Sequence, residues 1–159
     1  MSLALILCVL LLAVLVGIVL TGLRRVPEDR VVTVRRRGRY LRTLTPGLHW
    51  LVPGLDRIGS EVSLIGHHLS LPARPLGSAT AHTDLYFQIL EPLRIGEALE
   101  RVDDLVQRQA SQALDAFAAD PVPLASGLAA AAEALKAELN RRTALQGLRV
   151  IRCSLRPSA

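Results

Sequence analysis

The hydrophobic pattern of the chain begins with an uninterrupted apolar run. Residues 3–20 read LALILCVLLLAVLVGIVL and contain no charged side chain. A helix of this length extends about 27 Å, close to the hydrocarbon thickness of a bilayer. We therefore expect residues 1–23 to form a transmembrane helix. A buried core helix and a cleaved signal peptide are the alternatives, but a signal peptide has basic residues before a shorter apolar core, which this sequence lacks.

Short β-rich stretches follow the apolar run. Residues 31–34 are rich in β-branched side chains and lie between Pro27 and Gly38, which predicts a first strand. Residues 48–52 lie between two Pro-Gly pairs. Such pairs favour turns, because proline presets the turn dihedral angles and glycine tolerates positive φ. A second short strand is therefore expected between them.

A longer extended segment is expected at residues 57–71. Its apolar positions change parity near Gly66, and the extra residue of a β-bulge would produce such a change. Pro72 and Pro75 are expected to bracket a loop. After that loop, residues 82–89 alternate between apolar and polar side chains, which is the clearest pattern of a half-buried strand in the chain.

Helical spacing replaces this alternation in the C-terminal part of the chain. Apolar residues recur at helical intervals over 102–117, and Asp120-Pro121 is expected to end this helix. A second helix is expected to start near Leu124. Gly147 lies where its C-cap would fall, because glycine readily adopts the left-handed conformation of that position.

A final strand is expected at residues 148–155, with Ile151, Cys153 and Leu155 on one side. Together these elements predict an α+β fold. A transmembrane helix precedes a domain over residues 24–157, in which a small β-rich unit is followed by a mixed sheet with two helices.

Positive charge is concentrated just after the apolar run. Between residues 24 and 42, eight arginines accompany two acidic side chains, a local net charge of +6, whereas the whole chain carries +5. Basic residues that flank a span tend to stay in the cytoplasm, so we expect a single-pass membrane protein with a cytoplasmic C-terminal domain. The same arginines fit membrane lipids as a partner, since each contributes about 1 kcal/mol near an anionic leaflet.

This basic region need not recognise lipid specifically. A solvated basic strand that only sets the membrane topology accounts for the charge equally well. Nucleic acid is not expected as a partner, because the region has a single aromatic residue, Tyr40, and no recognisable binding motif.

The sequence gives little support to catalysis or metal binding. It contains no Gly-rich phosphate loop, no G-x-S-x-G and no H-E-x-x-H. Lys136 is the only lysine and lies in an Ala-rich segment expected to be a structural helix. His67, His68 and His82 come closest to a metal-binding set, but adjacent residues of a strand point to opposite faces. We therefore expect no enzyme activity, no cofactor and no metal.

Five segments resemble, in order, the sequences of the SPFH or band 7 family, which includes stomatin, prohibitin, flotillin and their bacterial relatives. They are VPEDRVVTVRRRGRY (26–40), TPGLHWLVPGLDR (45–57), LSLPARP (69–75), DLYFQILEP (84–92) and GLRVIRCSL (147–155). The resemblance covers roughly residues 26–157 and, as in the family, follows a membrane span. The chain resembles a short, bacterial-type member without the C-terminal coiled coil.

The resemblance implies a membrane-facing role for the Pro-Gly segment, which would place Trp50 against the bilayer. Tryptophan is favoured at the interface because its ring is apolar while its N–H can stay wet. The alternative is that Trp50 belongs to the core of the small β unit. The predicted membrane and lipid contacts are Arg24, Arg25, Arg35, Arg36, Arg37, Leu48, Trp50, Leu51 and Val52.

The resemblance further implies a non-enzymatic, membrane-anchored scaffold or modulator of a membrane protein partner. A membrane protease or a small protein of the NfeD type would be such a partner. Family members usually continue into a coiled coil that builds large oligomers, whereas this sequence ends at Ala159, so large rings are not expected and smaller homo-oligomers are left open. The alternative function is that of a shortened, assembly-deficient relative that acts as a lipid-surface binding module.

Overall fold

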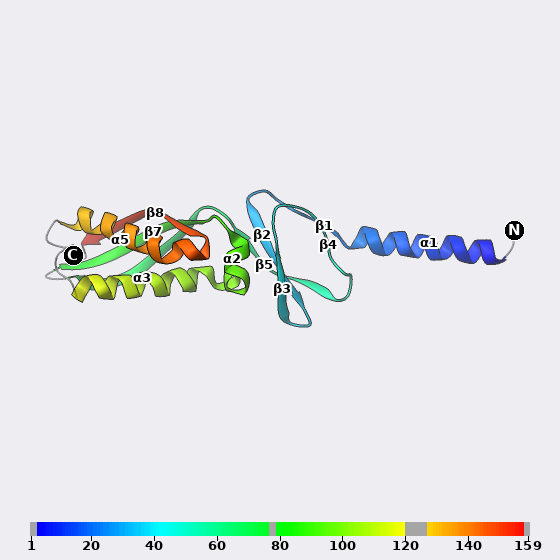
Figure 1. Cartoon of the computed structure of the whole chain (residues 1–159), viewed down its shortest axis with the longest axis horizontal. Coiled ribbons are helices and arrows are strands. Elements are labelled where there is room, and N and C mark those ends of the chain that lie inside the picture. Colours follow the sequence, from blue (N-terminus) through cyan, green and yellow to red (C-terminus); the bar gives the residue numbers. More distant parts are fainter. Residues whose placement is uncertain (1–2, 77–78, 120–126, 158–159) are drawn as a thin grey trace. The chain divides into compact units, whose positions relative to one another are not determined.

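The computed structural model describes residues 3–76, 79–119 and 127–157 (Figure 1). The chain divides into two compact units, Met1–Val62 and Ser63–Ala159. The first combines an N-terminal helix with short strands, and the second combines a sheet with helices. The predicted α+β class is therefore confirmed.

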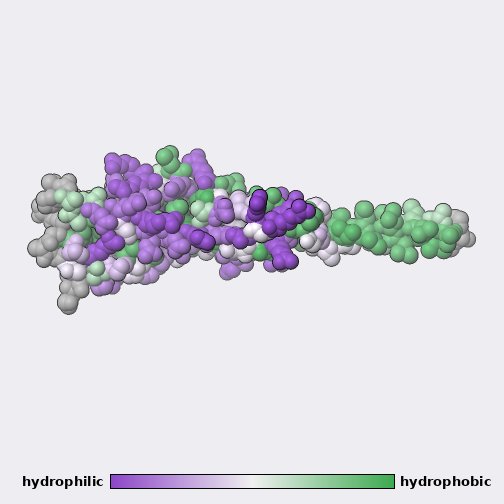
Figure 2. Space-filling view, turned by 90° about the horizontal axis from the view of Figure 1, so that it is seen from below, coloured by the Kyte–Doolittle hydropathy of each residue, from purple (hydrophilic) through white to green (hydrophobic). Residues whose placement is uncertain are grey.

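Helix α1 (Leu3–Thr21) contains the apolar run, and none of its side chains is buried. Figure 2 shows hydrophobic residues over its visible surface. Its length and composition are sufficient to cross a membrane. Its last turn ends in a hydrogen bond from the Gly22 N–H to the Ile18 carbonyl, 3.2 Å long.

Five short strands make up the rest of the first unit. Strands β1 (Leu23–Val26) and β4 (Gly47–Trp50) form a two-stranded antiparallel pair. Strands β3 (Arg39–Leu44), β2 (Arg30–Arg36) and β5 (Asp56–Ser63) form a three-stranded sheet in that order. The predicted strands at 31–34 and 48–52 correspond to β2 and β4.

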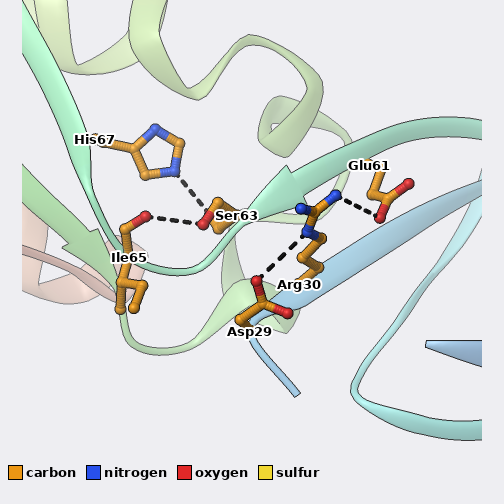
Figure 3. A network of polar contacts seen from close by, with 6 residues as sticks. All are labelled: Asp29, Arg30, Glu61, Ser63, Ile65 and His67. Carbon is orange, nitrogen blue, oxygen red and sulfur yellow. Dashed lines mark hydrogen bonds and ion pairs between the residues drawn. The ribbon is translucent and has the colours of Figure 1, made fainter. Parts of the chain in front are cut away.

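A small apolar cluster holds the first unit together. Val26 of β1 packs with Val32 and Val34 of β2 and Leu44 of β3, and Leu51 packs against this group. Arg30 adds a polar link, because it contacts Asp29 at 3.4 Å and Glu61 of β5 at 3.1 Å (Figure 3).

The sheet of the second unit consists of β6 (His67–Leu76), β7 (Ala79–Ile89) and β8 (Leu148–Pro157), with β7 in the centre. Both pairings are antiparallel. The predicted mixed sheet is therefore antiparallel. The strand predicted at 82–89 is confirmed, since every second residue of β7 from Ala81 to Ile89 is buried.

Helices cover one face of this sheet. The chain leaves β7 through α2 (Pro92–Ile95) and the 3-10 turn η1 (Gly96–Arg101) into α3 (Val102–Ala119). Helix α5 (Leu128–Thr143) and η2 (Ala144–Gln146) then lead to β8. The predicted helix end at Asp120-Pro121 and helix start near Leu124 lie outside the described residues.

The predicted single extended segment over 57–71 is wrong. The chain leaves β5 after Ser63 and enters β6 at His67, which belongs to a different sheet. Gly66 has a φ of 82° and lies in this break, so it is not a bulge within one strand. The Ser63 hydroxyl donates to the Ile65 carbonyl at 2.8 Å, and His67 Nε2 donates to the Ser63 carbonyl at 2.7 Å (Figure 3).

The loop predicted between Pro72 and Pro75 is also wrong. Both prolines lie within β6: Pro72 falls in a register shift between Leu71 and Arg74, and Pro75 pairs with Thr80. Strand β6 is at the edge of the sheet and pairs only with β7. Proline is tolerated in an edge strand, because no strand lies on the open side to accept the hydrogen bond that its missing N–H would donate.

A bulge in β8 overturns the predicted common face of Ile151, Cys153 and Leu155. The register of β8 against β7 shifts between Val150 and Arg152, opposite Phe87 and Tyr86. Val150 and Cys153 are buried, whereas Ile151 is half exposed. The extra residue of the bulge therefore turns Ile151 to the outside.

Candidate membrane-facing site

The pairing of β1 with β4 sorts the residues after α1 onto two faces. Leu23 lies opposite Trp50 and Arg25 opposite Leu48, whereas Val26 lies opposite Gly47. Directly paired residues of an antiparallel ladder share a face, and neighbouring residues alternate. Val26 is buried in the apolar cluster of the first unit. The other face, here called the outer face, therefore carries Leu23, Arg25, Leu48 and Trp50.

The outer face exposes large apolar side chains. Leu48 is 62% exposed, Leu23 47% and Trp50 44%. Arg25 lies among them and is exposed as well. An aromatic ring, aliphatic side chains and a cation at the end of an apolar helix are the residue types that favour the interface between hydrocarbon and water.

A close backbone approach fixes the position of Trp50. The Leu51 N–H donates to the Gly22 carbonyl at 2.8 Å, and Arg42 Nη2 donates to the Trp50 carbonyl at 2.8 Å. A Cβ atom at Gly22 would lie 2.5 Å from the Leu51 carbonyl oxygen and 2.5 Å from Trp50 Nε1. Only glycine at residue 22 allows this contact between the end of α1 and β4.

A partly buried ion pair, with a partly exposed Arg36 side chain and a buried Asp56 side chain, holds the segment that follows β4. Arg36 Nε donates to Asp56 Oδ1 at 2.7 Å, and the Val52 N–H donates to Asp56 Oδ2 at 2.9 Å. The Asp56 side chain is only 1% exposed. The Arg36 hydrogen bond, and then that of Val52, hold the pKa of Asp56 below its ordinary value, although burial acts in the opposite direction. The carboxylate thus fixes 52–56 against β2.

The structure brings some of the predicted contact residues together and separates others. Leu48, Trp50 and Arg25 share the outer face with Leu23. Arg24 is exposed but lies on the opposite side of β1. Leu51 packs against the apolar cluster. The remaining residues lie elsewhere in the unit. Val52 is half-buried and donates its N–H to Asp56, whereas Arg36 forms the ion pair with Asp56. Arg35 and Arg37 are the sequence neighbours of Arg36.

Sequence reasoning missed Leu23 and Asp56. Leu23 follows the apolar run by only a few residues, and its parity with Arg25 was the available signal. Asp56 has no such signal in the sequence, because its role depends on Arg36, which lies twenty residues away in the chain.

The histidines of the second unit have structural surroundings. The His67 ring stacks on Phe87 with centroids 4.8 Å apart, and the His68 ring stacks on Tyr86 at 4.6 Å. Phe87 is buried and Tyr86 is exposed, so the two histidines lie on opposite faces of the sheet. Among residues 3–76, 79–119 and 127–157, no three His, Cys, Asp or Glu side chains form a group that could hold a metal ion.

Similarity to known proteins is partial. No protein-family model matches the chain. Over 80 residues, 47% of its length, the chain is 36% identical to human stomatin-like protein 2, mitochondrial, and the match covers 22% of that protein. It is 30% identical over 95 residues to an uncharacterized protein of Schizosaccharomyces pombe, with 57% of this chain and 27% of the relative covered.

A third relative is an uncharacterized protein of Mycobacterium tuberculosis, 33% identical over 72 residues, which are 42% of this chain and 19% of the relative. The chain therefore spans roughly a quarter or less of the length of most of these relatives. The similarities link the chain to stomatin-like proteins, and hence to the SPFH family, over about half of its own length.

Proposed function

We propose that the chain is a single-pass, membrane-anchored and non-enzymatic scaffold of the SPFH type. In this proposal α1 spans the bilayer, the C-terminal domain lies in the cytoplasm, and the outer face of β1 and β4 rests at the membrane interface. The observation that carries it is the exposure of Leu23, Leu48 and Trp50 on one face, a few residues after an apolar helix. The partial similarity to stomatin-like protein 2 is compatible with such a role.

The proposed activity is to organise or modulate a membrane protein. The SPFH resemblance favours a membrane protease or a small NfeD-type protein as the partner, together with self-association of the chain. The alternative is an assembly-deficient module that only binds the lipid surface. The outer face supports this alternative as well, because contact with lipid alone is sufficient to cover it.

Fluorescence of Trp50 is expected to report its depth in the membrane. Trp50 is the only tryptophan, so emission from the full chain in vesicles comes from it alone. We expect stronger quenching by lipids brominated near the headgroup than by lipids brominated near the acyl-chain ends, because the indole N–H favours the interface.

A matched control moves the single tryptophan to the second unit. In the variant Trp50→Phe/Leu145→Trp, the new indole replaces a side chain that is 83% exposed. Its emission should be insensitive to bromine at any depth. Equal quenching in the two proteins, or none in the parent, would remove the proposed contact.

Photo-crosslinking in native membranes is expected to reveal assembly. Amine-reactive reagents suit this chain poorly, because Lys136 is its only lysine. We therefore place p-benzoylphenylalanine at Leu93, whose side chain is well exposed in the second unit. A discrete band at higher mass, absent without irradiation and assigned by mass spectrometry to a membrane protein or a second copy, is the result expected of a scaffold. A monomer alone contradicts the scaffold and favours the alternative.

A further inference from the structure

A hollow of about 460 Å³ in the first unit is lined mainly by cationic and apolar side chains. Arg37 and Arg57 provide the charge, and Leu55 and Ile58 provide the apolar wall. None of these four takes part in the outer face. Arg35 also lines the hollow. It is called the arginine hollow below.

The sequence builds the first wall as a tight hairpin. Strands β2 and β3 are joined through Arg37 and Gly38, and Arg36 pairs with Arg39. Both turn residues have positive φ, 53° at Arg37 and 82° at Gly38. Two successive residues of this kind form the hairpin turn whose twist matches the flanking strands. The turn therefore presents the Arg37 side chain at the end of the hairpin.

The second wall is the turn before β5. The N–H groups of Leu55 and Asp56 both donate to the Val52 carbonyl, at 3.2 and 2.9 Å, and Gly54 has a φ of 80°. The ion pair between Arg36 and Asp56 connects this wall to the first. Arg37 follows the arginine of this pair and Arg57 follows its aspartate, and both line the hollow.

The charges of Arg37 and Arg57 are not neutralised by an acidic side chain in the hollow. Asp56, the nearest carboxylate in the sequence, is occupied by Arg36. No acidic side chain among the described residues lines the hollow. Within the same described part of the chain, neither Arg37 nor Arg57 has an ion-pair or hydrogen-bond partner from its side chain.

We propose that the arginine hollow binds a phosphate monoester. A guanidinium group offers a planar fork of donors that matches phosphate oxygens, and two such groups balance the dianion of a monoester better than the single charge of a diester. Leu55 and Ile58, 46% and 42% exposed, lie beside the cations and suit the carbon skeleton that carries the phosphate. The group comes either from a lipid headgroup or from a soluble molecule. This inference does not depend on the scaffold role or on Trp50 contacting the bilayer.

Calorimetric titration of the full chain in nonionic detergent tests the proposal. The probes are inorganic phosphate, dihexanoyl phosphatidic acid as a monoester, and dihexanoyl phosphatidylglycerol as a diester. We expect phosphatidic acid to bind more tightly than phosphatidylglycerol. Replacing both cations (Arg37→Gln/Arg57→Gln) should weaken phosphatidic acid binding by a factor of about ten or more, since hydrogen bonds between charged groups are lost.

The control variant Arg101→Gln/Arg108→Gln removes the same charge from exposed positions of the second unit and should change the dissociation constant less than about twofold. Tighter binding of phosphatidic acid than of inorganic phosphate assigns the site to a lipid headgroup, and equal binding assigns it to soluble phosphates. The proposal is overturned if neither phosphatidic acid nor inorganic phosphate binds, if phosphatidylglycerol binds as tightly as phosphatidic acid, or if the two double variants bind phosphatidic acid equally well. Quenching of Trp50 should persist in Arg37→Gln/Arg57→Gln, which separates failure here from failure of the membrane contact.

Discussion

Replacing Asp56 with alanine is expected to lower the free energy of unfolding of the first unit by about 3 kcal/mol. The change removes hydrogen bonds from Arg36 and from the Val52 N–H to a carboxylate that is 1% exposed. It also releases the turn that follows β4 from β2. Urea unfolding of the full chain in micelles, followed by the fluorescence of Trp50, measures the effect within the same unit.

The matched control for this prediction is Asp29→Ala. The Asp29 carboxylate also meets an arginine, Arg30, but at 3.4 Å and with 55% of the side chain exposed. Solvent screens such a contact, so we expect a loss below about 0.5 kcal/mol. Similar losses in the two variants would show that the buried anchor at Asp56 contributes no more than a surface contact.

Acid should weaken the same anchor. Because hydrogen bonding lowers the pKa of Asp56 in the folded chain from its ordinary 3.8, its contribution is fully present above that value. The contribution is lost as the pH falls through the lowered folded-state pKa, where the carboxylate becomes protonated. The stability difference between the parent and Asp56→Asn should therefore shrink as the solution is acidified below pH 3.8.

The sequence predicts elements well where burial alone decides the pattern. Strand β7 alternates because one face packs under helices while the other is open, and α1 is uniformly apolar. The sequence of strand β3, RYLRTL, gives no clear strand signal, because arginines occupy exposed positions and obscure the buried Thr43 and Leu44. An exposed arginine does not indicate which neighbouring strand its own strand pairs with.

The parity of apolar residues underlies the corrections at residues 57–71 and at Ile151. The apolar pattern changes parity at Gly66, where the chain passes between two sheets, and shows no change at Ile151, where β8 has a bulge. Apolar character alone likewise places Leu48, Trp50, Leu51 and Val52 in one set of expected membrane contacts. Pairing with β1 instead places Leu48 and Trp50 outside, while Leu51 packs against the apolar cluster.

Replacing Gly147 with alanine is expected to destabilise the second unit by about 3 kcal/mol, through a strained backbone and a steric clash. Gly147 ends η2 with φ 71° and ψ 25°, a left-handed conformation that costs a residue with a Cβ free energy. The added Cβ would also lie 2.6 Å from Glu91 Cβ and 2.7 Å from the Glu91 carbonyl oxygen. Far-UV circular dichroism of α3 and α5 during urea unfolding measures the loss.

Relieving the clash at residue 147 would require the backbone to move, because the same glycine joins two parts of the second unit. Its carbonyl accepts hydrogen bonds from the N–H groups of Leu90 and Glu91, 2.8 and 3.1 Å long, which attach the end of β7 to the start of β8. Gly66→Ala is the control, since Gly66 has a φ of 82° but nothing within 4 Å of an added Cβ. It should cost only the backbone term of about 1 kcal/mol. Equal losses at the two positions would mean that the contact with Glu91 adapts without cost, and that this junction does not hold the sheet and the helices together.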